Sequence, residues 1–163
     1  MSVVEETIEV NVPVRTAYDQ WTQFEEFPKF MEAVKSVRQT DDTHLEWEAE
    51  IAGRDKKWRA EIIEQEPDKV ISWRSLDGAR NDGVVRFEPI DESRTRINLR
   101  IDADPEGPIE NIGDALGFLK RQVREDLERF KEFIEKRGTE TGAWRGEVHG
   151  GGAQPNEATS GDM

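Results

Sequence analysis

A long amphipathic helix near the end of the chain constrains the fold most strongly. Between about residues 106 and 137, apolar side chains recur at steps of three and four, which places them on one stripe of a helix. The stripe consists of Ile109, Ile112, Leu116, Leu119, Val123, Leu127, Phe130 and Ile134. A stripe this long must be covered by another part of the chain, and the preceding residues are the candidates for that cover.

The preceding residues alternate between apolar and charged side chains, which is the period of strands with one covered face. Strands are predicted at residues 3–10, 33–41, 43–51, 55–65, 69–75, 83–89 and 93–103. Two short helices are predicted after the first strand, at 14–23 and 24–31, the second kinked or capped around Pro28. The pattern predicts an α+β domain in which one helix lies across a curved antiparallel sheet. Wherever sheet and helix do not touch, such an arrangement leaves a hollow.

The helical and strand patterns stop at Arg137, which sets the predicted domain boundary. Residues 1–137 are predicted to form a single domain, large enough for a real core. Residues 138–163 contain seven glycines and are predicted to form a flexible tail. Trp144 is the exception in this tail, since it could dock on the body or contact a partner.

Composition excludes several kinds of function. The chain has no cysteine and only His44 and His149, so disulfides, thiolate metal sites, a cysteine nucleophile and a histidine-rich metal site are excluded. No cofactor and no metal are therefore predicted. A net charge of −13 opposes binding to nucleic acid or to anionic membranes. Without an 18-residue apolar run or a basic-then-apolar start, a soluble cytoplasmic protein with no integral membrane association is expected, and the oligomeric state stays open.

Several segments carry a resemblance to a known superfamily. They are Val12-Pro13-Val14 leading into Ala17-Tyr18-Asp19-Gln20-Trp21, then residues 24–31, Ile71-Ser72-Trp73-Arg74-Ser75, Gly83-Val84-Val85-Arg86-Phe87 and the strand from Thr95 to Ile101. Together with the order of elements over residues 3–137, they resemble the Bet v 1/START-like helix-grip (SRPBCC) superfamily. Within it, the chain is most similar to the bacterial polyketide cyclase/dehydrase and coenzyme-Q-binding START groups. The resemblance implies a helix-grip fold with a seven-stranded curved antiparallel sheet around a lipophilic cavity, and it transfers no catalytic residue.

Aromatic side chains on consecutive strands are the main candidates for ligand binding. Trp47, Trp58, Trp73 and Phe87 could form a wall that stacks a flat or polyprenyl ligand, or could be ordinary core. The other candidates lie on the short helices and the long helix. They are Phe27, Phe30, Met31, Leu116 and Phe118.

Glycines and charged residues give further expectations. Gly113 and Gly117 interrupt the long helix, at a cost of about 1 kcal/mol each, which suggests a close approach to the sheet or a ligand. Most acidic and basic residues of the strands fall on the outward parity and are expected to form cross-strand pairs in solvent. Tyr18, Asp19, Arg54 and Asp55 are possible polar groups near the cavity ends, and no catalytic residue is assigned.

Three functions remain open. The first is a carrier or chaperone that binds a hydrophobic small molecule, such as a lipid, a quinone or a polyketide-like intermediate, between sheet and helix. The second is a cyclase/dehydrase that folds a reactive poly-ketone chain by orienting it. The third is a protein-interaction module that uses residues 24–31 as an exposed apolar patch.

Overall fold

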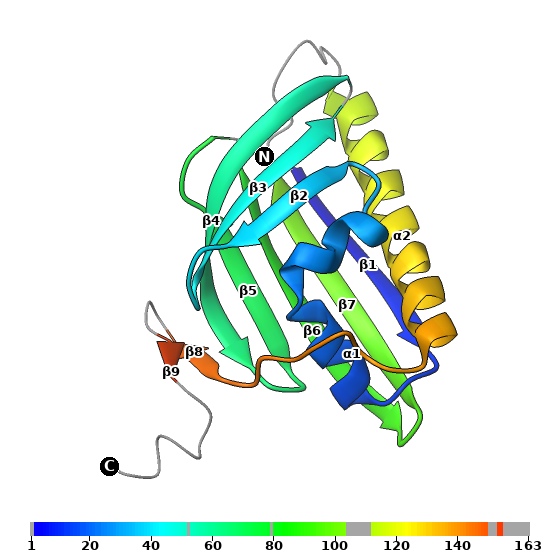
Figure 1. The fold of residues 1–163 in the computed structure, drawn as a ribbon. Helices are drawn as coiled ribbons and strands as arrows, with labels where there is room; N and C mark the ends of the chain where they lie inside the picture. The colour runs from blue at the N-terminus through cyan, green and yellow to red at the C-terminus, as the bar shows by residue number, and fades with distance from the viewer. Residues whose placement is uncertain (1, 52, 79, 104–111, 150–152, 155–163) are drawn as a thin grey trace.

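The protein folds as one curled antiparallel sheet with helices on its concave face (Figure 1). The computed structural model describes residues 2–51, 53–78, 80–103, 112–149 and 153–154. Seven strands follow one another in the order β1-β7-β6-β5-β4-β3-β2, and two short strands, β8 and β9, continue from β4. The predicted helix-grip fold with seven strands, two short helices and a long helix is confirmed.

The elements follow the predicted order closely. The seven main strands are β1 (Ser2–Val10), β2 (Val34–Gln39), β3 (His44–Ile51), β4 (Arg54–Glu66), β5 (Val70–Ser75), β6 (Asn81–Asp91) and β7 (Arg94–Ala103). The helices are α1 (Val14–Trp21), the 3₁₀ helix η1 (Phe24–Lys29) and α2 (Ile112–Arg137). The last two strands are β8 (Glu147–His149) and β9 (Ala153–Gln154). None of the helices in the described ranges is long and apolar enough to cross a membrane.

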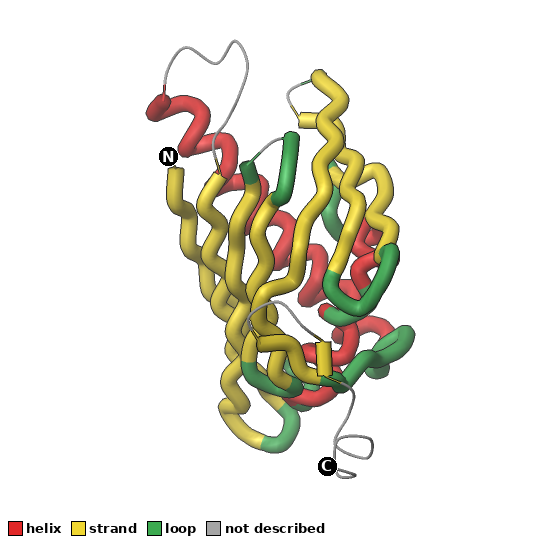
Figure 2. The backbone as a smooth tube through the Cα atoms, turned by 90° about the vertical axis from the view of Figure 1, so that its left-hand side faces the viewer, coloured by secondary structure: helices red, strands yellow, loops and turns green. Residues whose placement is uncertain are grey.

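Helix α2 packs along β1 and closes one side of the curled sheet, as Figures 1 and 2 show. Its stripe is buried at Val123, Leu127, Phe130 and Ile134, and Leu119 is half-buried against the core. Burying each of these side chains contributes about 1.5–3 kcal/mol, so tertiary packing holds the helix in place. The first three members of the predicted stripe (109, 112 and 116) lie outside the described side chains.

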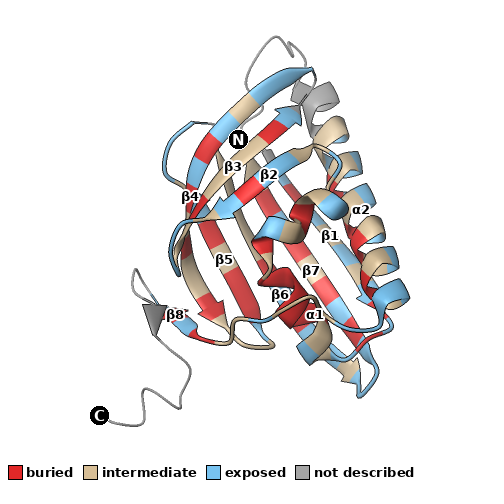
Figure 3. Cartoon of the chain, viewed as in Figure 1, coloured by how far each residue is buried: buried red, intermediate tan, exposed pale blue. Residues whose placement is uncertain are grey.

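The outer face of the sheet carries the predicted charge pairs. Along the strands, exposed residues of this outer face alternate with buried residues of the concave face (Figure 3). Arg74 binds Glu61 at 2.9 Å and Arg96 binds Glu88 at 2.6 Å across neighbouring strands. Because these pairs stand in solvent, each contributes little to stability, and together they keep this face hydrated.

The chain after α2 was predicted to form a flexible tail, but its first part packs against the domain. Residues 139–149, which we call the C-terminal strap, lie against α1 and the end of β4, and β8 pairs with β4 through Glu64↔His149 and Gln65↔Val148. Val148 is fully buried and Trp144 packs against the core. Glycine content alone predicted flexibility here, but these side chains find partners on segments distant in sequence. Residues 150–152 and 155–163 of the predicted tail lie outside the described residues.

Candidate functional site

Trp73 lies on the concave face of the sheet, directly opposite Gly83 on the neighbouring strand β6. A Cβ atom at position 83 would stand only 2.3 Å from the Cζ2 atom of Trp73, so the indole rests on the space that glycine leaves. The indole N–H donates to the Oδ1 atom of Asn81 at 3.4 Å. The pair formed by Trp73 and Gly83 lies toward the end of the sheet where β7 ends and α2 begins (Figure 1). Glycine therefore lets the indole lie against the strand instead of standing away from it.

Replacing Gly83 with alanine should displace this indole. The new methyl group would overlap the Trp73 ring, and forcing a side chain out of a packed position costs about 1–3 kcal/mol. We expect Gly83→Ala to lower the urea midpoint and to shift the tryptophan emission spectrum. Val84→Ala, on the opposite face of the same strand, serves as the control; equal spectral shifts in the two variants would contradict this packing.

Trp47 and Trp58 form a second aromatic site, separate from Trp73. Their rings stack across β3 and β4 with centroids 5.7 Å apart and planes 7° from parallel. They border an open groove of about 850 Å³ that crosses β2, β3 and β4. Its other lining residues are mostly charged or small: Glu25, Ser36, Val37, Arg38, Glu46, Glu48, Lys57, Arg59, Asp77 and Gly78.

Phe87 takes part in a third arrangement, in the core beneath α1. Its ring contacts Tyr18 at 5.4 Å and Trp21 at 6.1 Å, both with edge-to-face geometry. Phe27 and Phe30 extend the same aromatic cluster and are almost fully buried. This cluster meets the Trp47–Trp58 pair where the Phe27 ring lies 5.7 Å from the Trp47 ring, so among the described rings Trp73 is the one strand aromatic that lies apart from this network. Residues 24–31 are not an exposed apolar patch, which removes the basis of the interaction-module hypothesis.

The remaining predicted ligand residues lie along η1 and α2. Met31 is half-buried and packs against the core, and Phe118 is half-buried near the start of α2. A Cβ atom at Gly117 would meet nothing within 4 Å, so the predicted close approach to the sheet is wrong at this glycine, and the predicted approach to a ligand stays a prediction. The side chain of Leu116 and the surroundings of Gly113 lie outside the described residues.

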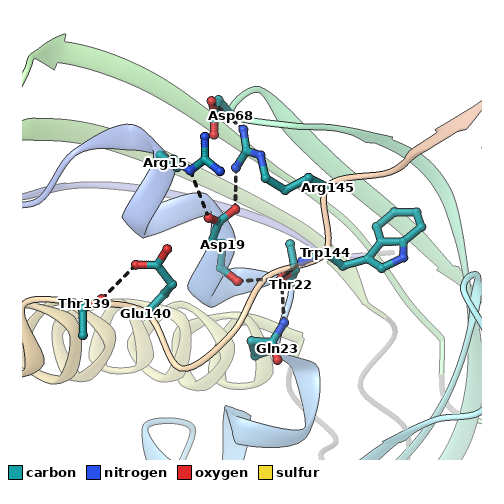
Figure 4. Close-up of polar contacts among 9 residues, drawn as sticks. All are labelled: Arg15, Asp19, Thr22, Gln23, Asp68, Thr139, Glu140, Trp144 and Arg145. Carbon is teal, nitrogen blue, oxygen red and sulfur yellow. Dashed lines mark hydrogen bonds and ion pairs between the residues drawn. The ribbon is translucent and has the colours of Figure 1, made fainter. Parts of the chain in front are cut away.

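A buried cluster of charged residues joins α1 to the C-terminal strap (Figure 4). Arg145 reaches from the strap to Asp19 of α1 and to Asp68 in the turn after β4, the latter at 2.8 Å. Asp19 is only 1% exposed and also faces Arg15 at 3.7 Å. Burial raises the pKa of Asp19 to about 6, although the adjacent Arg145 opposes this rise.

Two uncharged polar side chains lie beside this cluster. Tyr18 is fully buried, with the Arg145 guanidinium 5.6 Å from the centre of its ring. Within the described residues, the Tyr18 hydroxyl and the buried Gln65 amide make no hydrogen bond of good geometry, but they lie close enough together for the amide to lower the pKa of the hydroxyl. Burial nevertheless raises the pKa of Tyr18 well above its ordinary value, so the group stays a proton donor at neutral pH.

A second buried carboxyl group lies on α2. Asp126 is 13% exposed and binds Arg129 at 3.1 Å, while Arg129 also binds Glu32 at 2.8 Å. The backbone N–H of Glu32 donates to Asp126, which ties the segment after η1 to the helix. Burial raises the pKa of Asp126 to about 7 despite the opposing charge of Arg129.

One group of possible metal ligands occurs in the described ranges. Glu64, Glu66 and His149 hold carboxylate oxygens and ring nitrogens within 4.8 Å of one another, where β8 pairs with β4. The His149 imidazole already contacts Glu147 at 3.0 Å and is exposed. Two carboxylates and one imidazole suit a divalent cation, but no buried polar group orients them, so we assign no metal centre.

Sequence reasoning named Tyr18 and Asp19 but missed their partners. Arg145 lies in a glycine-rich segment without periodicity, so nothing in its sequence neighbourhood marks it as buried. Asp68 carries one local signal: it follows Pro67 in a turn and takes a left-handed conformation with φ of 65°. Only the folded chain brings these residues together.

Comparison with known proteins places this fold in a family. A family model described as polyketide cyclase/dehydrase and lipid transport matches residues 10–132, and the chain belongs to that family. An uncharacterized 17.2 kDa protein of Streptomyces lincolnensis is 52% identical over 149 residues, which cover 91% of this chain and 99% of that protein.

Two solved structures share the fold. A START superfamily protein from Mycobacterium smegmatis is 18% identical with a TM-score of 0.65, over 84% of this chain and 97% of its own. The Zhui aromatase/cyclase from a Streptomyces species is 17% identical with a TM-score of 0.67, over 83% of this chain and 94% of its own. At these identities the likeness concerns the fold alone. The predicted membership in the polyketide cyclase/dehydrase family is confirmed by the family model.

Proposed function

We propose that the protein binds a hydrophobic small molecule between the concave face of the sheet and α2, as a carrier or chaperone. The observation that carries this proposal is the pairing of Trp73 with Gly83. Because position 83 has no side chain, the large apolar ring of Trp73 lies flat against the strand, where it can offer its face to a ligand. Family membership supports the same conclusion, since the family is described by polyketide chemistry and lipid transport.

The buried charges also favour a carrier. A cyclase or dehydrase needs a free acid and a free base close to the substrate. The buried carboxylates of Asp19 and Asp126 each contact an arginine, and the half-buried Glu6 faces Arg124 at 3.6 Å. Carboxylates held in ion pairs are poorly placed to abstract a proton from a ketone.

A cyclase/dehydrase-type enzyme is the second candidate, favoured by the unpartnered hydroxyl of Tyr18. A neutral phenol with no partner could donate a hydrogen bond to a carbonyl of a poly-ketone chain. Incubation with a synthetic poly-β-ketone thioester, followed by mass spectrometry, separates the candidates. New cyclised or dehydrated products that disappear in Tyr18→Phe would support the enzyme, whereas unchanged thioester that stays bound would support the carrier.

Native mass spectrometry after gentle purification tests the proposal most directly. A carrier should retain a lipophile, seen as a mass increment that organic extraction removes. A protein of unchanged mass that also fails to bind long-chain acyl or prenyl probes would contradict the proposal.

Trp73 should contribute to binding of such a probe more than a charged residue of the outer face does. We expect Trp73→Leu, which keeps the site apolar but removes the flat ring, to weaken binding of a fluorescent acyl probe about tenfold, since tenfold corresponds to 1.4 kcal/mol of lost contact. Glu48→Ala should leave the affinity unchanged. Equal effects in a fluorescence titration would exclude Trp73 from the binding site.

A further inference from the structure

The C-terminal strap adds a segment to the domain that the family shares. The family model ends at residue 132, and the Mycobacterium structure is matched over 97% of its length by only 84% of this chain. The Streptomyces match covers 91% of this chain and therefore extends into the strap. The strap therefore lies beyond the residues that the family model matches and within the part shared with the Streptomyces relative.

The strap is held to α1 by specific hydrogen bonds. The Thr141 backbone N–H donates to the Gln20 side chain at 2.9 Å, and the Gln20 amide donates back to the Thr141 hydroxyl at 3.0 Å. The Trp144 backbone N–H donates to the Thr22 hydroxyl at 3.1 Å. A Cβ atom at Gly142 would come within 2.5 Å of the Gln23 side chain, so the strap fits closely at this point.

The surface beneath the strap is polar. The side chains of three buried residues contact the strap: Asp19, Gln20 and Thr22. The apolar contacts of the strap come from the buried Val148 and the half-buried Trp144. Each such hydrogen bond contributes only about 0.5–1.5 kcal/mol, because water replaces it when it breaks. Lifting the strap would therefore expose groups that water solvates well, and the rest of the domain can stay folded.

Arg145 is the central contact of the strap. Its guanidinium lies between Asp19 and Asp68 (Figure 4), so one side chain joins the strap to α1 and to the turn after β4. The same guanidinium lies 5.6 Å from the centre of the Tyr18 ring. Gly138 lies between the end of α2 and the start of the strap. It takes φ of 75°, and a Cβ atom at this position would meet nothing within 4 Å. A glycine of this kind after α2 is suited to act as a hinge.

The strap covers polar groups that lack partners. Val148 of the strap pairs with Gln65, and Arg145 lies over Tyr18. The Gln65 amide and the Tyr18 hydroxyl are both buried and lie near each other, but among the described residues neither makes a hydrogen bond of good geometry. Such groups gain hydrogen bonds as soon as water or a polar ligand reaches them, and this gain offsets part of the cost of release.

From these contacts we propose that residues 139–149 form a releasable strap, held shut by Arg145, which closes the α1 end of the domain and controls access to Tyr18 and Gln65. The proposal stands apart from the identity of any ligand, because release is a property of the chain itself.

Hydrogen exchange of the full-length protein, followed by mass spectrometry, tests this proposal. In the native protein, the backbone amides of residues 141–149 should exchange faster than those of β5, β6 and β7. Arg145→Ala should speed exchange in the strap and in residues 17–23 about tenfold or more while leaving β5–β7 unchanged, because it removes the arginine that both Asp19 and Asp68 contact. The matched control is Arg15→Ala, which also removes an arginine next to Asp19 but from the exposed side of α1, and should leave the strap unchanged.

Three results would overturn the proposal. The first is a strap that exchanges as slowly as β5–β7 in the native protein. The second is an Arg145→Ala variant that either fails to fold or exchanges faster everywhere, since the strap would then be part of the core. The third is unchanged strap exchange both in Arg145→Ala and in Thr141→Ala, a milder variant that removes one hydrogen bond and should give a smaller rise in the same amides.

Discussion

Replacing Trp21 with alanine is expected to destabilise the fold by about 3–5 kcal/mol, the usual cost of removing a buried aromatic side chain. Trp21 is 1% exposed and its ring contacts Phe27, Phe87 and Phe130, which belong to η1, β6 and α2. One side chain thus joins the short helices, the sheet and the long helix. The loss should appear as a lower free energy of unfolding in urea, with an unchanged denaturant dependence.

Trp144→Ala is the matched control, because it removes the same side chain from the strap. Trp144 is half-buried and packs at the edge of the core, so its loss should cost much less than the loss of Trp21. Equal losses in the two variants would mean that the aromatic cluster around Trp21 does not hold the layers together.

The second large effect is a change of stability with pH that depends on Asp126. Burial raises the pKa of this carboxyl group in the folded state to about 7, from an ordinary value of 3.8. The folded state therefore binds the proton more tightly than the unfolded chain, and the stabilising contribution is complete below about pH 4 and lost as the pH rises through 7. The full change is at most about 4 kcal/mol, at 1.36 kcal/mol for each pKa unit.

Urea unfolding between pH 4 and 8 measures this contribution against Asp126→Asn. The asparagine cannot titrate but its oxygen can still accept from the Glu32 N–H, so the variant should lose less stability than the native protein as the pH rises. Glu125→Gln, an exposed neighbour that also contacts Arg129, should retain the native pH dependence. If the curves of Asp126→Asn and the native protein ran parallel, burial would not control this carboxyl group.

The fold could be predicted from the sequence because its signals are local. Alternation in segments such as residues 43–51 and 93–103, and the stripe through Val123, Leu127 and Phe130, report directly which face of each element is covered. Pro13 and Pro28 mark where the first strand ends and where the second short helix is interrupted. These features need no knowledge of distant contacts, so the structure has the elements within a few residues of their predicted places.

The site was less predictable, because the alternation along a strand shows which face of the sheet a side chain occupies but not which residues lie beside it. Trp47, Trp58, Trp73 and Phe87 all fall on the inward parity as predicted, but parity did not show that Phe27 would link Trp47 to the cluster around Phe87 while Trp73 packs on Gly83. That Trp73 rests on Gly83 follows from the register of β5 against β6, which the sequence alone does not fix.

The burial of polar residues on and just after helix α1 could not be predicted from the sequence. The residues Asp19, Gln20 and Thr22 have the composition of a solvent-facing helix surface, yet all three are buried beneath the strap. Their cover comes from more than a hundred residues away and from a segment whose glycine content suggested flexibility. A polar surface that is covered by polar contacts leaves no hydrophobic signal in the sequence.

The polar surface of α1 also has an evolutionary consequence. A helix end whose polar groups water can solvate stays compatible with an uncovered domain, so an appended peptide can arise there, be trimmed or be replaced without exposing a large apolar surface. Lineages of this fold could thus acquire new control elements simply by lengthening the reading frame after the final helix, with selection acting on one arginine and a few hydrogen-bonding partners.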